Sequence, residues 1–377
     1  MACCCEAARL SHLEDRYNRR GAVLALGLMS GTSLDGVDAA LVETDGERVL
    51  GLGPSLTVPY EPGFRQRLRA VLGGVGPVAE VERDLTLIHA EVVRCLLVQA
   101  GLAPSAVGLI GFHGHTILHR PEERRTWQIG DGALLAATTG IDVVCDFRAN
   151  DVAEGGQGAP LVPVYHRALA AGLDAPLAVL NLGGVGNVTW IGRDGGLLAF
   201  DTGPGNALLD DWALAHTGQP VDLDGRLADS GRVDQAAVAA FLAHPYFDRV
   251  PPKSLDRDDF QAHAAALVTG LSAADGAATL AAFTVASVAA ASRWFPEPVA
   301  RWLVCGGGRR NPAIMRALTE SLAVAVEPVD IVGWDGDALE AQAFAFLAAR
   351  VKAGLPLTFP QTTGAPRPLG GGRVFRA

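Results

Sequence analysis

The sequence predicts an α/β protein in which one domain plan occurs twice, with a cleft between the two copies. Two glycine-rich turns indicate the repeat, one at residues 29–38 and one at residues 181–187, and apolar runs flank both of them. The length of 377 residues is sufficient for two domains that each bury a core. Apolar residues make up 49% of the chain and aromatic residues only 6%, a composition typical of an ordered α/β protein.

The first half is predicted to have the order βββαβαβ. A tight turn at 29–38 separates the opening strands, and apolar residues such as Val81, Leu85 and Ile88 recur at helical spacing further on. The expected elements are strands over 22–28, 37–42 and 49–52, helices over 62–72 and 79–101, a strand over 107–112, a helix that opens at 127–132, and a strand over 141–145.

The second half is predicted to repeat this plan. It begins with a strand, a glycine-rich turn and a returning strand, and an alanine-rich helix that we expect to be buried follows. The expected elements are strands over 176–180, 188–191 and 197–200, helices from 207 and over 233–242, 260–271 and 277–292, a strand over 301–305, a helix opened by 305–308, and a last helix over 338–352. Ligands of such sheets bind at the carboxyl ends of strands, where the glycine-rich turns lie.

These patterns divide the chain into two domains and an extension. Domain I is expected over 21–150, with the C-terminal segment 353–377 packing back on it, and domain II over 151–352. Residues 1–20 are expected to be a disordered N-terminal extension. The three consecutive cysteines at 3–5 leave a lipidation or metal site as the alternative for this extension.

The turn at 29–38 has the composition of an anion-binding site. Gly31 and Gly36 permit positive φ values and a close approach of the backbone to a ligand. Ser30, Thr32 and Ser33 add hydroxyl groups to the exposed backbone N–H groups. An ordinary hairpin turn is the alternative, and the second turn of the same kind favours the binding function.

Charge and motifs argue against several classes of protein. The net charge of −10 disfavours nucleic acid as the main partner, because phosphate neutralisation needs clustered Lys and Arg. The two lysines, Lys253 and Lys352, do not belong to a Gly-Lys-Ser/Thr phosphate loop, and no glycine triplet satisfies G-x-G-x-x-G. Two hairpin turns and the triple glycine at 306–308 instead favour a nucleotide gripped between two domains.

The cysteines and the apolar runs bear on location. The six cysteines show neither zinc-ribbon spacing nor a disulfide framework, which indicates a reducing cytoplasm. Residues 1–20 lack the apolar core of a signal peptide, and the run at 277–292 is shorter than the roughly 20 residues that a membrane span needs. We therefore expect a cytoplasmic protein without a membrane partner.

Nine blocks of sequence follow one another in a recognisable order. They are 28–38, 113–114, 128–130, 146–148, 155–163, 181–184, 200–206, 252–254 and 304–308. In these blocks the chain closely resembles the anhydro-N-acetylmuramic acid kinase family, which belongs to the actin/hexokinase-like ATPase superfamily. The resemblance covers roughly residues 22–377, and the number of blocks in the right order makes it highly specific.

The resemblance implies two ribonuclease-H-like (actin/hexokinase-type) domains with a central nucleotide cleft, in an enzyme that forms a homodimer. It also implies the reaction, in which water attacks the anomeric carbon of 1,6-anhydro-N-acetylmuramic acid and the freed O6 takes the γ-phosphoryl group of ATP. The products are N-acetylmuramic acid 6-phosphate and ADP, in the recycling of cell-wall sugar. ATP and Mg²⁺ are the implied cofactors.

The resemblance also implies roles for individual residues. Asp201 matches the general base that takes a proton from the attacking water. The residues expected to bind the sugar are His113, Arg148, Gln157 and Glu340, with Arg148 on the lactyl carboxylate. The residues expected to bind ATP are Gly31, Thr32, Ser33, Leu34, Asp35, Gly36, Val37, Asp38, Gly183, Gly184, Gly203, Gly205, Asn206, Gly306, Gly307 and Gly308. Asp35 and Asp38 are also the candidates for holding Mg²⁺ through its waters.

Structural alternatives stay open for three of these residues. Asp201 precedes a Gly-Pro-Gly turn, so it could cap the following helix. Asp38 could be an outward-facing strand residue. Arg148 could form an ion pair that only supports the fold.

The chain departs from the family pattern at His115, where relatives have Gln after His-Gly. This departure puts the detail of the sugar contacts in doubt. Together with His113, His119 and the downstream carboxylates Asp142 and Asp146, it leaves a metal-dependent hydrolase as an alternative.

Two further functions stay open on the sequence alone. One is a kinase of the same superfamily that phosphorylates an ordinary hydroxyl of another sugar. The other is a nucleotide-gated sugar sensor or chaperone-like ATPase that works by domain closure. A DNA-binding regulator is disfavoured, because residues 1–20 are too short and too mixed in charge for a helix-turn-helix segment.

Overall fold

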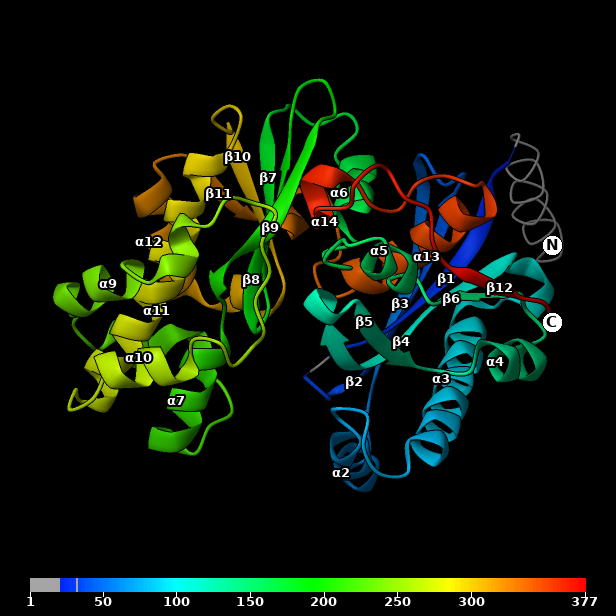
Figure 1. Ribbon diagram of the computed structural model, residues 1–377, viewed down its shortest axis with the longest axis horizontal. Helices are drawn as coiled ribbons and strands as arrows, with labels where there is room; N and C mark the ends of the chain where they lie inside the picture. Colours follow the sequence, from blue (N-terminus) through cyan, green and yellow to red (C-terminus); the bar gives the residue numbers. More distant parts are fainter. Residues whose placement is uncertain (1–20, 32) are drawn as a thin grey trace, which may run out of the picture. The chain divides into compact units, whose positions relative to one another are not determined.

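The computed structural model of the protein describes residues 21–31 and 33–377 (Figure 1). The extension expected over 1–20 and the ATP contact expected of Thr32 therefore lie outside the described residues. The chain divides into two compact units. Unit 1 comprises the described residues up to Gly158 together with Glu340–Thr358 and Arg367–Ala377, and unit 2 comprises Ala159–Leu339 and Phe359–Pro366.

Unit 1 is built on a mixed seven-stranded sheet in the order β12-β6-β4-β1-β2-β3, with β5 paired to β4. Strands β1, β4 and β6 run parallel, whereas β2 is antiparallel to β1 and β3, β5 to β4, and β12 to β6. The elements are β1 (Val23–Ser30), β2 (Gly36–Thr44), β3 (Val49–Pro59), α2 (Pro62–Ala70), α3 (Val78–Ala100), β4 (Leu109–Arg120), β5 (Arg125–Ile129), α4 (Gly132–Thr139), β6 (Val143–Cys145), α5 (Ala149–Ala153), α13 (Leu339–Lys352) and β12 (Arg373–Phe375).

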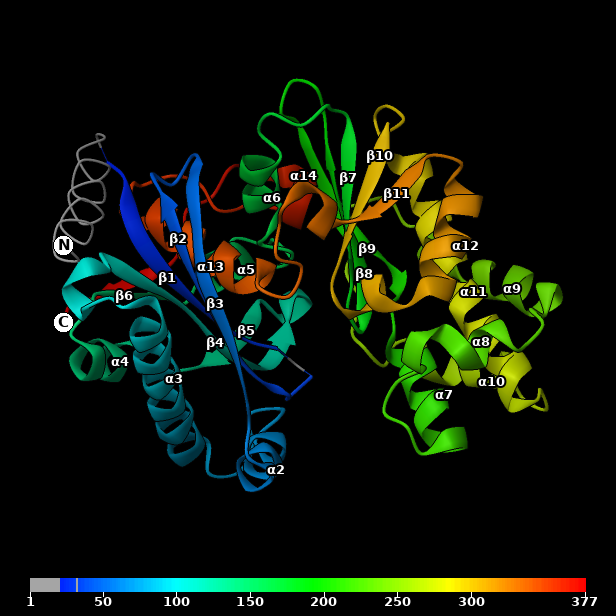
Figure 2. The ribbon, with the colours of Figure 1, turned by 180° about the vertical axis from the view of Figure 1, so that it is seen from behind.

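Helices pack on both faces of this sheet (Figures 1 and 2). Leu26 and Leu28 of β1 are buried in one hydrophobic cluster with apolar residues of α3. Gly27 lies between them, so it faces the opposite side of the sheet, where α13 packs. A Cβ atom at Gly27 would lie 1.7 Å from the Ala341 carbonyl oxygen, and one at Gly111 of β4 would lie 2.0 Å from another α13 carbonyl oxygen. These glycines let the α13 backbone lie directly on β1 and β4.

Helix α13 belongs to the other unit than the sequence predicts. The sequence analysis assigned 338–352 to domain II, whereas Glu340 and the rest of this helix belong to unit 1. The physical reason is the close packing of the α13 backbone on Gly27 of β1 and Gly111 of β4, which lie more than 200 residues earlier in the chain. The C-terminal strand β12 also joins the sheet of unit 1, but α14 (Pro360–Thr363) belongs to unit 2.

Unit 2 repeats the strand order of unit 1 in its five-stranded sheet, β11-β10-β7-β8-β9. Strand β8 is antiparallel to β7 and β9, and β7, β10 and β11 run parallel. The remaining elements used here are α6 (Pro163–Leu169), β7 (Leu177–Leu182), β8 (Val185–Ile191), β9 (Leu197–Pro204), α7 (Ala207–Thr217), α8 (Arg226–Asp229), α9 (Gln235–Leu242), the 3-10 helix η4 (Pro245–Asp248), α10 (Gln261–Leu267), α11 (Ala273–Ala291), β10 (Arg301–Cys305), the 3-10 helix η6 (Gly307–Arg310), α12 (Pro312–Leu322) and β11 (Ala325–Pro328). The shared order confirms the predicted α/β fold with two ribonuclease-H-like domains, whereas the nucleotide cleft stays a prediction.

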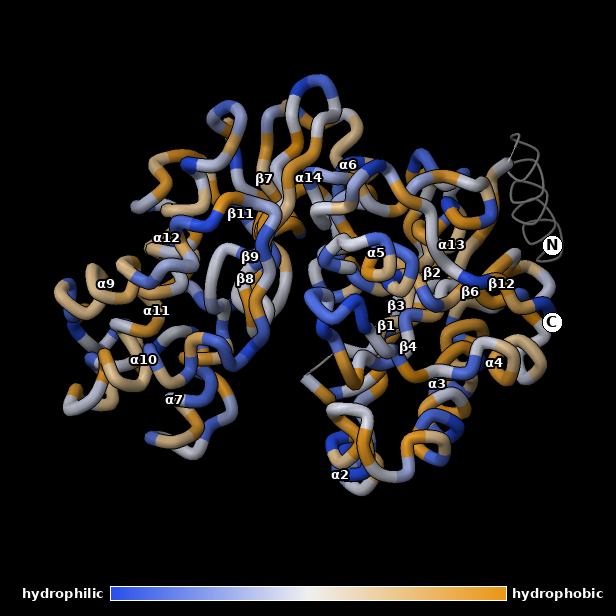
Figure 3. Tube along the Cα trace, viewed as in Figure 1, coloured by the Kyte–Doolittle hydropathy of each residue, from blue (hydrophilic) through white to orange (hydrophobic). Residues whose placement is uncertain are grey.

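The apolar helix predicted over 277–292 is the core helix of unit 2. Within the described chain, Ala273–Trp294 is the one helical stretch long and apolar enough to cross a membrane, and 61% of its apolar window is buried. Helix α11 packs against α7, α8, α9 and α12, so its apolar character serves the core. Helix α3 of unit 1 has an amphipathic pattern instead. Figure 3 shows apolar and polar residues alternating along this helix, which packs one face on a sheet.

Several predicted elements differ in extent from the observed ones. The helix expected to open at 127–132 begins at Gly132, because 125–129 form strand β5 and the Asp131 side chain caps the helix by accepting from the N–H groups of Ala133 and Leu134. The turn expected over 181–187 contains only Gly183 and Gly184, because β7 and β8 continue into it. Strand β9 likewise continues to Pro204.

Candidate functional site

The turn between β1 and β2 in unit 1 is tightly packed at Gly36 and open at Gly31. The Leu34 N–H donates to the Gly31 carbonyl oxygen at 3.1 Å, and Leu34 is buried with a φ of 59°. A Cβ atom at Gly36 would lie 2.3 Å from the Val58 carbonyl oxygen, so only glycine fits against β3 there. At Gly31 the nearest described atom to such a Cβ atom is 3.6 Å away. The backbone at Gly31 is therefore accessible to a ligand, as expected for an anion-binding turn.

A buried hydrogen-bond chain supports this turn from below. Ser30 Oγ lies 2.6 Å from Tyr60 Oη and 2.9 Å from His115 Nδ1, and all three residues are buried. Burial lowers the pKa of His115 to about 4, against an opposite effect of Asp35, so the imidazole is neutral near pH 7. His115 thus contacts the base of the turn, which gives the departure from the family pattern a structural role.

Three carboxylates of unit 1 lie within electrostatic reach of one another. Asp35 is exposed at the turn, and Asp38 on β2 is half-buried and accepts a hydrogen bond from Thr57 Oγ1 at 2.6 Å. Glu340 lies in the first turn of α13. Glu340 is an exposed residue, but protein atoms around its carboxyl withdraw that group from water and raise its pKa; Arg148 lowers the pKa, and Asp38 and Asp35 raise it. The fold therefore brings Glu340 near residues that precede it by some 300 positions.

His113 and Arg148 form a directed pair at the carboxyl end of β4. His113 Nδ1 lies 2.8 Å from the Gly114 carbonyl oxygen, which can only accept, so Nδ1 carries the proton. His113 Nε2 then accepts from Arg148 Nε at 3.2 Å, and Arg148 Nη1 donates to the Gly158 carbonyl oxygen at 2.7 Å. Burial, followed by the Arg148 charge, lowers the pKa of His113 well below its ordinary value. Burial also lowers the pKa of Arg148 to about 10, which leaves it charged near pH 7.

Three of the four predicted sugar-binding residues thus come together in unit 1. His113 touches Arg148, and Arg148 is coupled electrostatically to Glu340. The fourth residue, Gln157, directly precedes Gly158, whose carbonyl oxygen accepts from Arg148. The hydrogen bonds of Arg148 go to an imidazole and a carbonyl group, while the carboxylates of Glu340 and Asp151 act on its charge, so the ion-pair alternative stays open.

The described residues do not support the metal-dependent hydrolase. No group of three His, Cys, Asp or Glu side chains in residues 21–31 and 33–377 is arranged to hold a metal ion. His115 bonds to Ser30, and His119 Nδ1 lies 2.9 Å from Thr126 Oγ1. Asp142 forms an ion pair with Arg376. The histidine pattern therefore reflects three separate environments along β4.

In unit 2, two glycine-rich segments form one backbone cradle. The Gly205 N–H donates to the Gly184 carbonyl oxygen at 2.9 Å, and the Asn206 N–H donates to the Gly183 carbonyl oxygen at 2.7 Å. A Cβ atom at Gly205 would lie 2.2 Å from the Gly183 carbonyl oxygen. Asn206 Nδ2 donates to the Leu182 carbonyl oxygen at 2.8 Å, so this side chain also ties the end of β9 to the end of β7.

The triple glycine after β10 reaches the same cradle. Gly306 has a φ of 74°, and a Cβ atom there would lie 2.4 Å from Asn181 Oδ1. A Cβ atom at Gly308 would lie 2.7 Å from Asn206 Oδ1, whereas at Gly307 the nearest described atom is 3.8 Å away. The backbone at Gly307 is thus open while its neighbours are packed.

Not every residue predicted to bind ATP lines these turns. The side chains of Leu34 and Val37 are buried in the hydrophobic cluster of unit 1. Gly203 lies within β9, where a Cβ atom would meet Ser287 Oγ of α11 at 2.6 Å. These three positions serve packing in the structure, and any contact of theirs with ATP stays a prediction.

Asp201 lies on β9, and one of its two carboxylate oxygens accepts a hydrogen bond from the protein. The Leu255 N–H donates to Asp201 Oδ2 at 2.8 Å, and in the described chain Oδ1 has no hydrogen-bond donor. Burial raises the pKa of Asp201 to about 7; the Leu255 N–H lowers it and Asp256 raises it further. The cap position of α7 belongs to Asn206, five residues later, so the helix-cap alternative for Asp201 is wrong. Asp201 is therefore a half-buried carboxylate that can exchange a proton near neutral pH.

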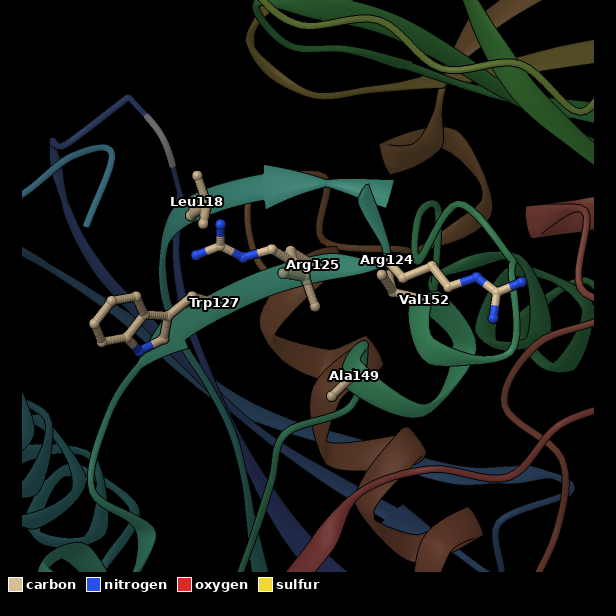
Figure 4. Close-up of a pocket in the computed structure, with 7 residues that line it drawn as sticks. Leu118, Arg124, Arg125, Trp127, Ala149 and Val152 are labelled. Atoms are coloured by element: carbon tan, nitrogen blue, oxygen red, sulfur yellow. The ribbon is translucent and has the colours of Figure 1, made fainter. Parts of the chain in front are cut away.

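Two cavities lie near these residues, one in each unit. A cavity of about 270 Å³ in unit 1 is lined by the β4–β5 hairpin and α5, and in Figure 4 the side chains of Arg124 and Arg125 run in opposite directions along the hairpin. None of the predicted site residues lines it. A cavity of about 360 Å³ in unit 2 is lined partly by Tyr246 and Leu255, which both hydrogen-bond to Asp201.

Sequence reasoning missed the residues that hold the site residues in place. Tyr60 supports the β1–β2 turn, and Tyr246, Lys253 and Leu255 surround Asp201 through hydrogen bonds. Only Lys253 gave a signal in the sequence, because it is one of two lysines in 377 residues and follows two prolines.

The family model and the similar proteins of known name agree with one another. The family model described as anhydro-N-acetylmuramic acid kinase matches residues 23–377. The chain is similar to the anhydro-N-acetylmuramic acid kinase of Paramagnetospirillum magneticum, with 70% identity over 93% of this chain and 99% of that protein. It is also similar to that of Rhodospirillum rubrum, with 62% identity over 95% of each chain. Among solved structures, an activator of the 2-hydroxyisocaproyl-CoA dehydratase from Clostridium difficile with bound ADPNP aligns over 88% of this chain and 97% of that chain, at 13% identity and a TM-score of 0.45.

Proposed function

The chain belongs to the anhydro-N-acetylmuramic acid kinase family, and from this premise we propose how its residues carry out the reaction. The protein is a sugar kinase that consumes 1,6-anhydro-N-acetylmuramic acid, water and ATP and releases N-acetylmuramic acid 6-phosphate and ADP. The observation that carries the residue assignment is Asp201, a carboxylate with a pKa of about 7 and one oxygen free of protein donors.

Asp201 is the proposed general base. Leu255 occupies Oδ2, so Oδ1 takes the proton of the attacking water. The water oxygen bonds to the anomeric carbon, the bond from that carbon to O6 breaks, and O6 bonds to the γ-phosphorus of ATP as the bond to the β-phosphate oxygen breaks. A base with a pKa near the working pH is partly ionised and still accepts a proton readily.

Unit 1 supplies the proposed sugar-binding residues. The lactyl group of the substrate carries a carboxylate, and Arg148 is a half-buried guanidinium with hydrogen-bonding capacity beyond its bonds to His113 and Gly158. His113 is neutral and accepts from Arg148, so it orients the guanidinium without competing for the substrate charge. Glu340 and Gln157 are the proposed acceptor and donor for sugar hydroxyl and amide groups.

The glycine-rich turns of both units are the proposed ATP-binding residues. The open backbone at Gly31, Gly183 and Gly307 suits phosphate oxygens and the nucleoside, which side chains would block. Asp35 and Asp38 are proposed to hold Mg²⁺ through its waters. The donor chemistry fits, because these carboxylates raise the pKa of Glu340 and a cation relieves such crowding of negative charge. When bound, Mg²⁺ neutralises charge on the transferred phosphoryl group.

Location and assembly belong to the same proposal. The family resemblance supports a cytoplasmic homodimer, and the three described cysteines, Cys95, Cys145 and Cys305, are free thiols, as expected in a reducing compartment. Light scattering coupled to gel filtration tests the dimer, for which the expected mass is twice the 39.2 kDa of one chain.

The test is an ADP-release assay in ¹⁸O-labelled water with 1,6-anhydro-N-acetylmuramic acid, ATP and Mg²⁺. We expect a 6-phosphorylated reducing sugar with one ¹⁸O at the anomeric carbon, formed by the wild type and by the control Asp194→Asn, an exposed carboxylate on the β8–β9 turn. Asp201→Asn is expected to turn over at least about a hundredfold more slowly. Turnover in Asp201→Asn close to the wild-type rate would move the base elsewhere. ATP binding by the wild type without turnover would favour the sensor or a kinase for another sugar.

A further inference from the structure

Lys253 is a buried cation without a carboxylate partner in the described chain. It is 5% exposed, and its Nζ donates to the carbonyl oxygens of Tyr246 at 3.0 Å and Phe247 at 3.3 Å. The ring centroids of Tyr246, Phe200 and Trp294 lie 4.4, 5.9 and 5.9 Å from Nζ. Burial of an ammonium group costs free energy even when carbonyl dipoles and aromatic faces offset part of it. An apolar residue would avoid this cost, so stability of the fold alone does not explain a lysine at this position.

The segment that Lys253 anchors holds Asp201 at three points. The Asp201 N–H donates to the Lys253 carbonyl oxygen at 3.0 Å, and Tyr246 Oη donates to the Asp201 carbonyl oxygen at 2.5 Å. The third contact is the Leu255 N–H on Asp201 Oδ2. The two parts of this segment, η4 and residues 253–255, are tied together by the ammonium group of Lys253. One side chain thus links the two parts of the segment that make these three contacts.

We propose that Lys253 is a positioning residue for the general base: its ammonium group locks η4 to residues 253–255, so that Tyr246 and Leu255 hold the Asp201 carboxylate with Oδ1 directed to the reacting water. The inference rests on the proposed function, because it assigns Lys253 a role through Asp201. It adds a residue that does not touch substrate to the machinery of the reaction.

Several charged groups lie near this segment and bear on how the pKa of Asp201 responds to a change at Lys253. Asp256 raises the pKa of the Asp201 carboxyl, and the Leu255 N–H lowers it. The charges that act on the Tyr246 phenol are Asp201, Arg249 and Asp259. The charges around the Lys253 ammonium group are Arg293, Arg249 and Asp248. The Leu255 N–H favours the ionised carboxylate, so displacement of residues 253–255 after removal of Lys253 raises the pKa of Asp201.

The experiment compares Lys253→Met with Lys352→Met, the other lysine of the chain, which is exposed at the end of α13. Methionine has a similar length and no donor, and it fits an aromatic cage. The variant is expected to fold, because both carbonyl oxygens retain another hydrogen-bond donor. The Arg249 N–H still donates to the Tyr246 carbonyl oxygen, and the Arg293 side chain still donates to the Phe247 carbonyl oxygen. We expect kcat to fall about tenfold, the value for about 1.4 kcal/mol, with KM for sugar and ATP unchanged. The acid limb of the kcat profile moves to higher pH, and Lys352→Met matches the wild type.

Wild-type kcat and an unshifted acid limb in Lys253→Met would overturn the proposal, as would an equal loss in Lys352→Met. A lower melting temperature with an unshifted limb assigns Lys253 to stability alone and also overturns it. If Lys253→Met does not fold, Tyr246→Phe decides, because it removes only the Oη contact with Asp201 and is expected to lower kcat at constant KM. Absence of turnover in the wild type overturns the proposed function, and the inference with it.

Discussion

The first hairpin turn of unit 1 and the first hairpin turn of unit 2 occupy the same position in two sheets of the same order, yet they are stabilised differently. Between β1 and β2, a buried Ser30 bonded to Tyr60 and His115 supports the turn. Between β7 and β8, the turn is two glycines whose carbonyl oxygens accept backbone N–H groups from the segment after β9. Unit 1 uses side chains and unit 2 uses the backbone.

This difference follows the chemistry that each unit is proposed to provide. Recognition of a charged sugar needs oriented cations and acceptors, and unit 1 concentrates Arg148, His113 and Glu340. Contact with phosphates and a nucleoside needs bare backbone, which unit 2 supplies at Gly183 and Gly307 and unit 1 at Gly31. Unit 2 adds one carboxylate, Asp201, with a raised pKa. A duplicated fold thus keeps its strand order while we propose different tasks for its two copies.

The largest expected effect is that of Asp201→Asn, which tests whether unit 2 holds the base. We expect kcat to fall by about a hundredfold or more, the usual contribution of a general base. In the wild type kcat should rise with pH through about 7, the pKa of Asp201, and then level off. The pH–rate profile of both proteins is the measurement.

Stability should change in the opposite direction in the same variant. The folded pKa of Asp201 lies above the unfolded value of about 3.9, so the folded state holds the proton more tightly and the wild type loses stability as the pH rises from about 4 through about 7. Asp201→Asn should therefore melt at a higher temperature than the wild type at pH 8, and the difference should shrink toward pH 4. A variant less stable than the wild type at pH 8 would contradict the assigned burial of this charge.

The next effect compares a backbone-packed glycine with an open one. Gly205→Ala should cost about 3 kcal/mol of unfolding free energy, because its Cβ atom would meet the Gly183 carbonyl oxygen at 2.2 Å. Gly31→Ala should change the unfolding free energy by less than about 1 kcal/mol, since the nearest described atom is 3.6 Å away. Denaturant unfolding measures both. Equal costs would show that the two turns are packed alike.

The smallest effect concerns the side-chain support in unit 1. Ser30→Ala leaves the buried Tyr60 hydroxyl and His115 Nδ1 without their shared partner and should cost about 2 kcal/mol. Ser33→Ala removes an exposed hydroxyl that bonds to Asp35 and should stay within about 0.5 kcal/mol. Thermal and denaturant unfolding of the two variants give the difference, and an equally mild Ser30→Ala would remove the contrast between the turns.

Local patterns were enough to predict the duplicated fold but not the seat of α13. Apolar runs and glycine turns identified β1, β2, β7, β8 and β10, because burial and turn chemistry are encoded locally. The attachment of α13 to unit 1 depends on Gly27 and Gly111, which look unremarkable until the helix backbone is seen to lie on them. Strand β5 was missed because its pairing with β4 is a tertiary contact.

The candidate site was predicted by resemblance, and the structure adds what that could not supply. The sequence named Asp201, but neither its raised pKa nor the Leu255 N–H on Oδ2 could be read from residue types. It treated His115 as a possible disturbance of sugar contacts, whereas the imidazole faces Ser30. Supporting residues are hard to predict because their partners are distant in sequence and their bonds often involve the backbone.

The central claim is that unit 2 performs proton transfer and unit 1 binds the sugar. The most direct test measures kcat and sugar KM for Asp201→Asn and Arg148→Met in one ADP-release assay. The account predicts a large fall in kcat with little change in KM for Asp201→Asn, and for Arg148→Met a KM raised about tenfold or more with kcat within about threefold, as expected for lost binding of a charged group. If both variants change the same kinetic parameter, the two units do not divide the work in this way.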